Sequence, residues 1–214
     1  MANGLLDEVD KELERRGHSF VRYADDLNVY VRSRRAGERV MASLRKLFGK
    51  LKLRINENKS KVTRATQAKF LGFSFWLAEG RVVRRRVAPE AIERLKERVR
   101  ELTRRSAGRS LAQMCKPLGT YLSGWKAYFR LTEAPGALAD IDGWVRHRLR
   151  AVQLKHWKRG RVIYRELIAR GMPADAARQV AGNSRRWWRN SSMALNRALP
   201  HAPFTRPGVP SLAS

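Results

Sequence analysis

Asp25 and Asp26 are the residues whose type and spacing best suit metal chemistry, because they place two carboxylates side by side. The runs on either side, residues 20–23 and 27–31, are rich in β-branched and aromatic residues, and a pair of aspartates between such runs is a turn signal. This pattern predicts a β-hairpin over residues 18–32 with both carboxylates at its tip. Ionised carboxylates are hard oxygen ligands that suit Mg²⁺, which is commonly held by one or two carboxylates and substrate phosphates. The alternative is an ordinary turn at a solvated edge.

The charge of the chain points to a polyanionic partner. Its 214 residues carry a net charge of +27, and 43% of them are hydrophobic, which is enough for a folded core in one or two domains. Residues 1–88 have 21 basic and 10 acidic side chains, and residues 89–214 have 25 and 9. Such an excess repels itself unless a polyanion is bound, and a nucleic-acid backbone is the expected one. We expect no membrane partner, because the longest apolar run, residues 70–78, is far too short to span a bilayer.

Cysteine usage agrees with a cytoplasmic location. The lone Cys115 can form no internal disulfide, which fits a reducing compartment, and it is expected to be a small buried apolar residue. The N-terminus shows no secretory signal.

The predicted elements indicate an α+β fold in which the strands precede a helical part. The hydrophobic periodicity up to residue 88 predicts a helix over 2–16, the hairpin over 18–32, a helix over 36–50, a strand over 51–55 and a second hairpin over 69–87. Beyond residue 88 it predicts a helix that begins at Pro89, a short helix that Ser110 caps and Pro117 interrupts, and a longer helix that runs to Arg130. A linker at 135–136 and the longest helix, over 137–158, follow. Two further helical stretches are expected over 160–170 and 173–198. We expect the proline-rich residues 199–214 to be a disordered tail.

The features of residues 1–88 resemble, in this order, the palm of reverse transcriptases, and most closely that of the group II intron-encoded reverse transcriptase/maturase family. The family's metal-binding motif, Tyr-x-Asp-Asp, corresponds to residues 23–26. The resemblance implies that Asp25 is a direct Mg²⁺ ligand in a two-metal site and that Asp26 is its less strictly required neighbour. It also implies a partial palm in which Lys59 meets phosphate charge and the Phe70, Leu71 and Gly72 turn approaches a primer. A solvated lysine and plain core packing are the respective alternatives.

The second half is similar to the thumb and maturase-specific region of that family. Residues 124–130 look like its Gly-Trp-x-x-Tyr-Phe signature, and residues 184–189 look like its final Trp-Arg element. Between Gly143 and Arg165 there are eight basic residues and no acid. Cations meet phosphates and flat rings stack on exposed bases, so this region suits structured RNA. The predicted RNA contacts are Arg146, Arg148, Arg150, Lys155, Trp157, Lys158 and Arg159.

Helical periodicity places Arg146, Arg150 and Trp157 on one side of the predicted helix, away from its apolar stripe. We expect Trp125 and Trp144 to be core residues, whereas for Trp157 both a core role and an RNA-contacting role remain open. A zinc site is not expected, because no cysteine or carboxylate stands at ligand spacing from the histidines.

The resemblance also defines what this chain is not expected to supply. The family's fingers, its palm strand with the other metal-binding aspartate and its nuclease region have no counterpart, so a truncated or split protein is the hypothesis. Three functions stay open: an RNA-directed DNA polymerase that acts on an RNA/DNA primer-template when joined to a separate N-terminal fragment, an RNA-binding splicing factor for intron RNA with vestigial aspartates, or a decayed fragment. The expected domains are the partial palm over 1–88, the helical RNA-binding region over 89–198, and the tail over 199–214.

Overall fold

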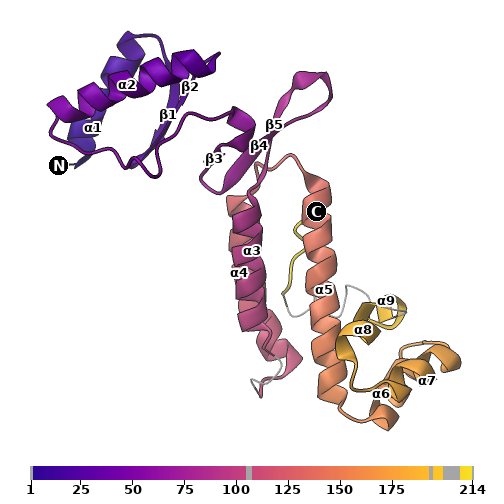
Figure 1. The fold of residues 1–214 in the computed structure, drawn as a ribbon. Helices are drawn as coiled ribbons and strands as arrows, with labels where there is room; N and C mark the ends of the chain where they lie inside the picture. Colours follow the sequence, from indigo (N-terminus) through magenta and orange to yellow (C-terminus); the bar gives the residue numbers. More distant parts are fainter. Residues whose placement is uncertain (1, 105–107, 193–194, 200–207, 214) are drawn as a thin grey trace. The chain divides into compact units, whose positions relative to one another are not determined.

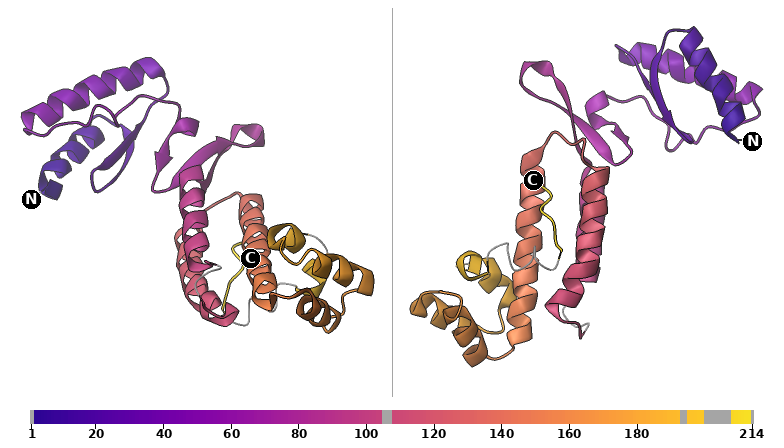
Figure 2. Two further views of the ribbon diagram at one scale, coloured as in Figure 1. Left: turned by 60° about the horizontal axis from the view of Figure 1, so that its bottom comes forward. Right: turned by 180° about the vertical axis from the view of Figure 1, so that it is seen from behind.

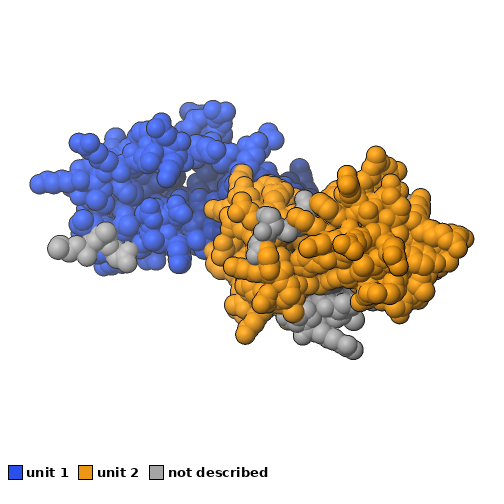
Figure 3. All heavy atoms as spheres, turned by 90° about the horizontal axis from the view of Figure 1, so that it is seen from below, with its two compact units in different colours: residues 1–88 blue, residues 89–214 orange. Residues whose placement is uncertain are grey.

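The computed structural model describes residues 2–104, 108–192, 195–199 and 208–213. The chain divides into two compact units, residues 1–88 and residues 89–214 (Figure 3). The predicted α+β class is confirmed, since all strands of the described residues belong to the first unit and the second unit is helical there. None of the described helices is both long and apolar enough to cross a membrane.

The first unit begins with two helices that enclose a hairpin in sequence. They are α1 (Ala2–Arg15), β1 (Ser19–Tyr23), β2 (Asp26–Tyr30) and α2 (Arg34–Lys50), close to the predicted ranges (Figure 1). Ser33 caps α2, because its hydroxyl accepts a hydrogen bond from the Ala36 amide at 3.2 Å. Helix α1 contacts both α2 and β1, so it is the element that joins the hairpin to the second helix.

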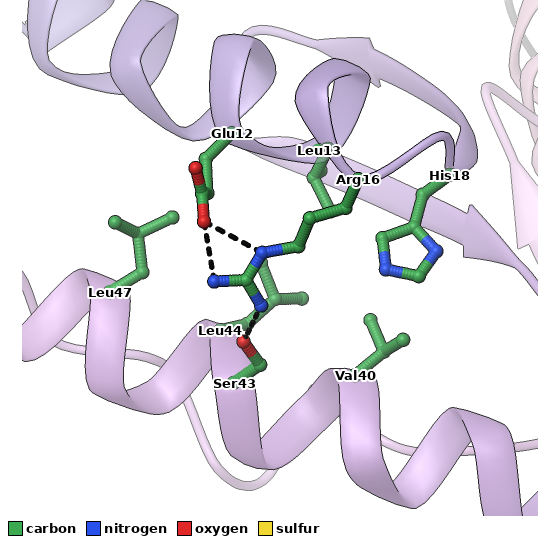
Figure 4. A pocket seen from close by; sticks show the side chains of 8 residues that line it. All are labelled: Glu12, Leu13, Arg16, His18, Val40, Ser43, Leu44 and Leu47. Atoms are coloured by element: carbon green, nitrogen blue, oxygen red, sulfur yellow. Dashed lines mark hydrogen bonds and ion pairs between the residues drawn. The ribbon is translucent and has the colours of Figure 1, made fainter.

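An ionic cluster and apolar side chains hold α1 on α2 (Figure 4). Leu13 of α1 is buried, and half-buried α2 residues line the same contact, where the gap is only about 10 Å³. The Glu12 carboxylate accepts hydrogen bonds from the Arg15 guanidinium at 2.7 Å and from the Arg16 guanidinium at 2.6 Å. Arg16 also donates to the Ser43 hydroxyl of α2. Glu12 therefore orients an arginine that bridges the two helices.

The rest of the first unit is a three-stranded antiparallel sheet in the order β3-β4-β5. Its strands are β3 (Lys69–Phe70), β4 (Phe73–Leu77) and β5 (Val83–Val87), with the short 3₁₀ helices η1 (Ala65–Gln67) and η2 (Glu79–Arg81) before and within it. The predicted strand over 51–55 is wrong. The amides of Leu51, Lys52 and Leu53 instead bond to carbonyls of the last turn of α2, so this backbone closes a helix and pairs with no strand.

Among the described residues of the second unit, three long helices form the body and four short ones follow. They are α3 (Pro89–Leu102), α4 (Leu111–Tyr128) and α5 (Pro135–Trp157), then α6 (Gly160–Ile168), α7 (Ala174–Gly182), α8 (Trp187–Ser192) and α9 (Leu195–Ala198). Both views in Figure 2 show α6–α9 gathered beside α5. The core consists of fully buried aliphatic residues of the long helices, among them Leu95, Val99, Leu118, Leu122, Leu149 and Val152. Cys115 is buried there as predicted, and burial raises the pKa of its thiol to about 11.

Several helix boundaries differ from the prediction. Pro117 lies inside α4 without interrupting it, while Ser110 caps that helix in a reciprocal pair with Gln113. Pro135 is in the first turn of α5, where a missing amide hydrogen costs little, so residues 135–136 are no linker. The predicted stretch 173–198 is divided into α7, α8 and α9, and the Asn190 side chain of α8 donates to the carbonyls of Val180 and Asn183 at the end of α7.

The disordered tail predicted over 199–214 is wrong for residues 208–213, which pack on the second unit. Val209 and Leu212 are buried. The buried Asp142 carboxylate of α5 accepts hydrogen bonds from the Ser211 hydroxyl at 2.6 Å and from the Leu212 amide at 2.9 Å. Two buried apolar side chains and one buried acceptor therefore help to hold this segment on the second unit. Residues 200–207 and 214 of the predicted tail lie outside the described residues.

The contribution of Glu12 should depend on pH. Hydrogen bonds from Arg15 and Arg16 lower the pKa of its carboxyl from 4.5 to about 2, so its contribution is complete above 4.5 and lost as the pH falls through about 2. We expect Glu12→Gln to reduce the free energy of unfolding of the first unit at pH 7, and the difference from wild type to shrink from about pH 5 downward. Urea unfolding followed by circular dichroism measures it. The exposed Glu14→Gln is the control, and a difference that stays constant with pH contradicts the assignment.

Removing the buried acceptor Asp142 should release the C-terminal segment. In Asp142→Ala the amides of Leu212 and Ala213 lose their acceptor, and each unsatisfied buried donor costs roughly 1–3 kcal/mol. We expect the free energy of unfolding of the second unit to fall by roughly 1–3 kcal/mol. The loss is no larger because the C-terminal segment can detach, after which water satisfies its amides. Limited proteolysis should also remove the C-terminus faster. Asp140→Ala, an exposed position on the same helix, should behave as wild type.

Candidate functional site

The two carboxylates predicted to bind metal lie at the tip of the β1–β2 hairpin, as expected. Tyr23 pairs with Asp26, which leaves Ala24 and Asp25 as a two-residue loop. Ala24 adopts the left-handed conformation that such tight loops require, with φ of 54°. Both aspartates are exposed, so their oxygens are accessible to a cation and its other ligands.

A half-buried arginine, Arg22, holds the loop at the hairpin tip in place. It was not among the residues predicted from the sequence. The Arg22 guanidinium donates to both carboxylate oxygens of Asp10 on α1, at 2.9 Å from Nε, and to the Ala24 carbonyl in the loop at 2.9 Å. The two paired side chains are 18% and 20% exposed. The hydrogen bond that Arg22 donates to the Asp10 carboxylate raises the pKa of Arg22. The only sequence signal was an arginine on the inward-facing alternate positions of β1, where an acidic partner is needed.

The donor set at the tip fits part of a Mg²⁺ site. Asp25 and Asp26 offer carboxylate oxygens, and Mg²⁺ usually completes its coordination with waters and substrate phosphates. Within the part of the chain that the structure describes, no third histidine, cysteine, aspartate or glutamate joins them in one cluster. Among the described residues, the hairpin tip therefore offers two carboxylates and no third candidate ligand.

The other predicted contacts of the first unit lie in turns. Lys59 is exposed, and its backbone amide bonds to the Asn56 carbonyl at 3.1 Å, so it lies in a tight turn. Phe70, Leu71 and Gly72 are half-buried at the β3–β4 turn, where Leu71 and Gly72 have φ values of 50° and 78°. Their half-burial is compatible with both packing and a backbone contact to nucleic acid.

Two of the arginines predicted to meet RNA instead serve the fold of the second unit. Arg150 is only 7% exposed, and its Nε donates to the Leu199 carbonyl at 2.9 Å. Burial, together with the nearby charge of Arg146, lowers the pKa of Arg150. Arg148 donates to the Thr103 hydroxyl and, at 3.0 Å, to the Arg100 carbonyl at the end of α3. The placement of Arg150 on an exposed helix side is therefore wrong, because α5 is covered on more than one side at this level.

Three exposed cations lie where α5 passes into α6. Lys158, Arg159 and Arg161 are exposed, and no acidic side chain among the described residues pairs with any of them. We call these three residues the α5–α6 corner. Of the other predicted contacts, Arg146 is half-buried, and the Lys155 ammonium lies 5.4 Å from the ring centroid of Trp187. Arg161 was not among the predicted RNA contacts, although it lies in the stretch from Gly143 to Arg165 that contains no acidic residue.

Burial and ring contacts differ among the three tryptophans of α4 and α5. Trp125 is buried and its ring lies 4.5 Å from that of Phe129, which confirms the predicted core role. Trp144 is half-buried with the Arg100 guanidinium 5.6 Å from its ring centroid. Trp157 is also half-buried, and the Arg170 guanidinium lies 5.0 Å from its centroid, so one approach to that ring is occupied.

Two family models match consecutive parts of the chain. Residues 1–75 match the reverse transcriptase (RNA-dependent DNA polymerase) family, and residues 92–170 match the group II intron, maturase-specific domain. A comparison with curated proteins found no match. The first match includes the carboxylate hairpin, Lys59 and the β3–β4 turn, and the second includes the α5–α6 corner.

Proposed function

We propose that this chain, which belongs to the group II intron reverse transcriptase/maturase family, binds folded intron RNA through its helical unit and presents a Mg²⁺-binding carboxylate pair on its first unit. The observation that carries the RNA-binding part is the α5–α6 corner, three exposed cations without acidic partners among the described residues, inside the maturase-specific match. Unpaired cations on a folded surface attract phosphates and release counterions when they bind them.

The carboxylate hairpin supports a role in RNA-directed DNA synthesis on a primer-template. Asp25 and Asp26 would hold Mg²⁺, which when bound stabilises negative charge on the attacking and leaving oxygens of phosphoryl transfer. Arg22 would keep the loop in place, since it joins the Ala24 carbonyl to Asp10. We expect polymerisation to need a further carboxylate and a nucleotide-binding surface from outside the described residues.

A second candidate function is RNA binding in support of splicing with no part for the carboxylates. It is favoured by the division of the chain, because the corner and the carboxylates belong to different compact units. Each unit has its own buried residues, so loss of the aspartates need not disturb the helical unit.

Neutralising the α5–α6 corner should reduce both RNA affinity and its salt dependence. In the variant with Lys158, Arg159 and Arg161 changed to Gln, we expect the slope of log K against log salt to fall in magnitude by roughly 2, since each phosphate contact contributes about 0.7–0.9. Fluorescence anisotropy with a folded intron domain measures it. The control changes Arg109, Lys116 and Arg130 to Gln, which are exposed in the same unit and remove the same charge. Equal slopes for both variants would contradict a localised RNA site.

Mg²⁺ binding should depend on the hairpin tip. We expect Asp25→Asn to weaken Mn²⁺ binding, used as a paramagnetic probe for Mg²⁺, by about tenfold or more, since the charge of the ligands sets affinity at such oxygen sites. Water proton relaxation measures it, and Glu79→Gln, an exposed acid in the other hairpin turn, is the control. If the wild-type chain binds Mn²⁺ no better than Asp25→Asn, the second candidate function replaces the polymerase role.

A further inference from the structure

Trp188 is a large aromatic residue that is exposed and yet held rigidly. Its side chain belongs to α8 and the residue is 44% exposed. The His147 ring of α5 stacks on the indole with ring centroids 3.8 Å apart and an interplanar angle of 26°. His147 Nε2 also donates to the Trp188 carbonyl at 2.7 Å, because a carbonyl oxygen can only accept. The imidazole thus fixes both the ring and the backbone of Trp188.

The rest of α8 is anchored on two sides. The Asn190 side chain, which is buried, donates to the Asn183 carbonyl at 2.9 Å and to the Val180 carbonyl at 3.2 Å. On the other side, the Lys155 ammonium of α5 lies 5.4 Å from the ring centroid of Trp187. The position of the Trp188 indole is therefore set before any ligand arrives, so little conformational entropy is lost on binding.

All charged residues near Trp188 in sequence are cationic. Arg185, Arg186 and Arg189 flank it, and all three are exposed. From residue 176 to residue 214 the chain contains no aspartate or glutamate. A flat exposed ring with several exposed arginines next to it in the sequence suits a ligand that combines an aromatic face with negative charge.

We propose that Trp188 is a stacking platform for one unpaired base of the bound RNA, whose adjoining phosphates meet Arg185 and Arg186. This inference rests on the proposed RNA-binding function and adds the kind of nucleotide that the second unit selects. Base-paired RNA hides its base faces within the helix, whereas loops, bulges and ends can place a base on an aromatic ring. An apolar protein partner fits less well, because it would have to remove water from the neighbouring guanidinium groups.

The test compares two RNAs with equal numbers of phosphates, a short oligoadenylate and a blunt-ended duplex. For the full chain carrying Trp188→Ala, we expect the affinity for oligoadenylate to fall by roughly 5- to 150-fold, the range for loss of one base–aromatic stack, while duplex affinity stays nearly unchanged. Fluorescence anisotropy at low salt gives both affinities. No loss, or an equal loss on both RNAs, would overturn the proposal.

Two further variants keep the test decisive if Trp188→Ala loosens α8. Trp188→Phe retains a ring face and should keep most of the affinity for oligoadenylate, whereas Trp188→Leu retains apolar bulk without a ring face and should show the loss. Equal affinities of these two variants would overturn the platform. Failure of the wild-type chain to bind either RNA would instead refute the proposed function itself.

Discussion

Like-charge repulsion is the constraint under which both units fold, since 46 lysines and arginines face only 19 acidic side chains. The first unit meets it with ion pairs, and the cluster of Glu12 with Arg15 and Arg16 and the bridge from Arg22 to Asp10 are the clearest cases. The second unit makes more use of backbone oxygens. Arg148, Arg150 and Lys126 donate to the carbonyls of Arg100, Leu199 and Ser211, two of which lie at helix ends. Carbonyls at the C-terminal end of a helix carry partial negative charge and accept such donors readily.

The sequence predicted those elements whose signals are local. The hairpin with Asp25 and Asp26 at its tip needs only alternating residues and a turn pair, and the cap at Ser110 needs only its own helix. The prediction of a strand over 51–55 was wrong because a strand needs a partner strand to pair with. The alternation of Leu51, Leu53 and Ile55 does not indicate whether such a partner exists. The order of residues 208–213 was missed for the same reason, since Asp142 lies about 70 residues earlier in the chain.

The candidate site was predictable to the same extent and no further. Composition alone could identify a basic helix, but it could not show which cations the fold would bury. Arg150 was placed correctly with respect to the apolar stripe of α5, yet that side is covered too, and the carbonyl of Leu199, just after α9, accepts a hydrogen bond from its guanidinium. The stack of His147 on Trp188 joins residues 41 positions apart, so no spacing rule could have found it.

The covering of α5 has a consequence for where RNA can be bound. Asp142 near its start receives the C-terminal segment, Arg148 and Arg150 in its middle bond to carbonyls, and Lys155 near its end lies over Trp187. The three cations of the corner at which α5 ends remain exposed, as do Arg185, Arg186 and Arg189 around α8. In such a surface the unpaired cations supply affinity that depends on salt and little on sequence, whereas a fixed aromatic ring distinguishes an unpaired base from a paired one. Under the proposed function, α5 therefore serves mainly as the scaffold, and the residues at its end and on the helices packed around it contact the RNA.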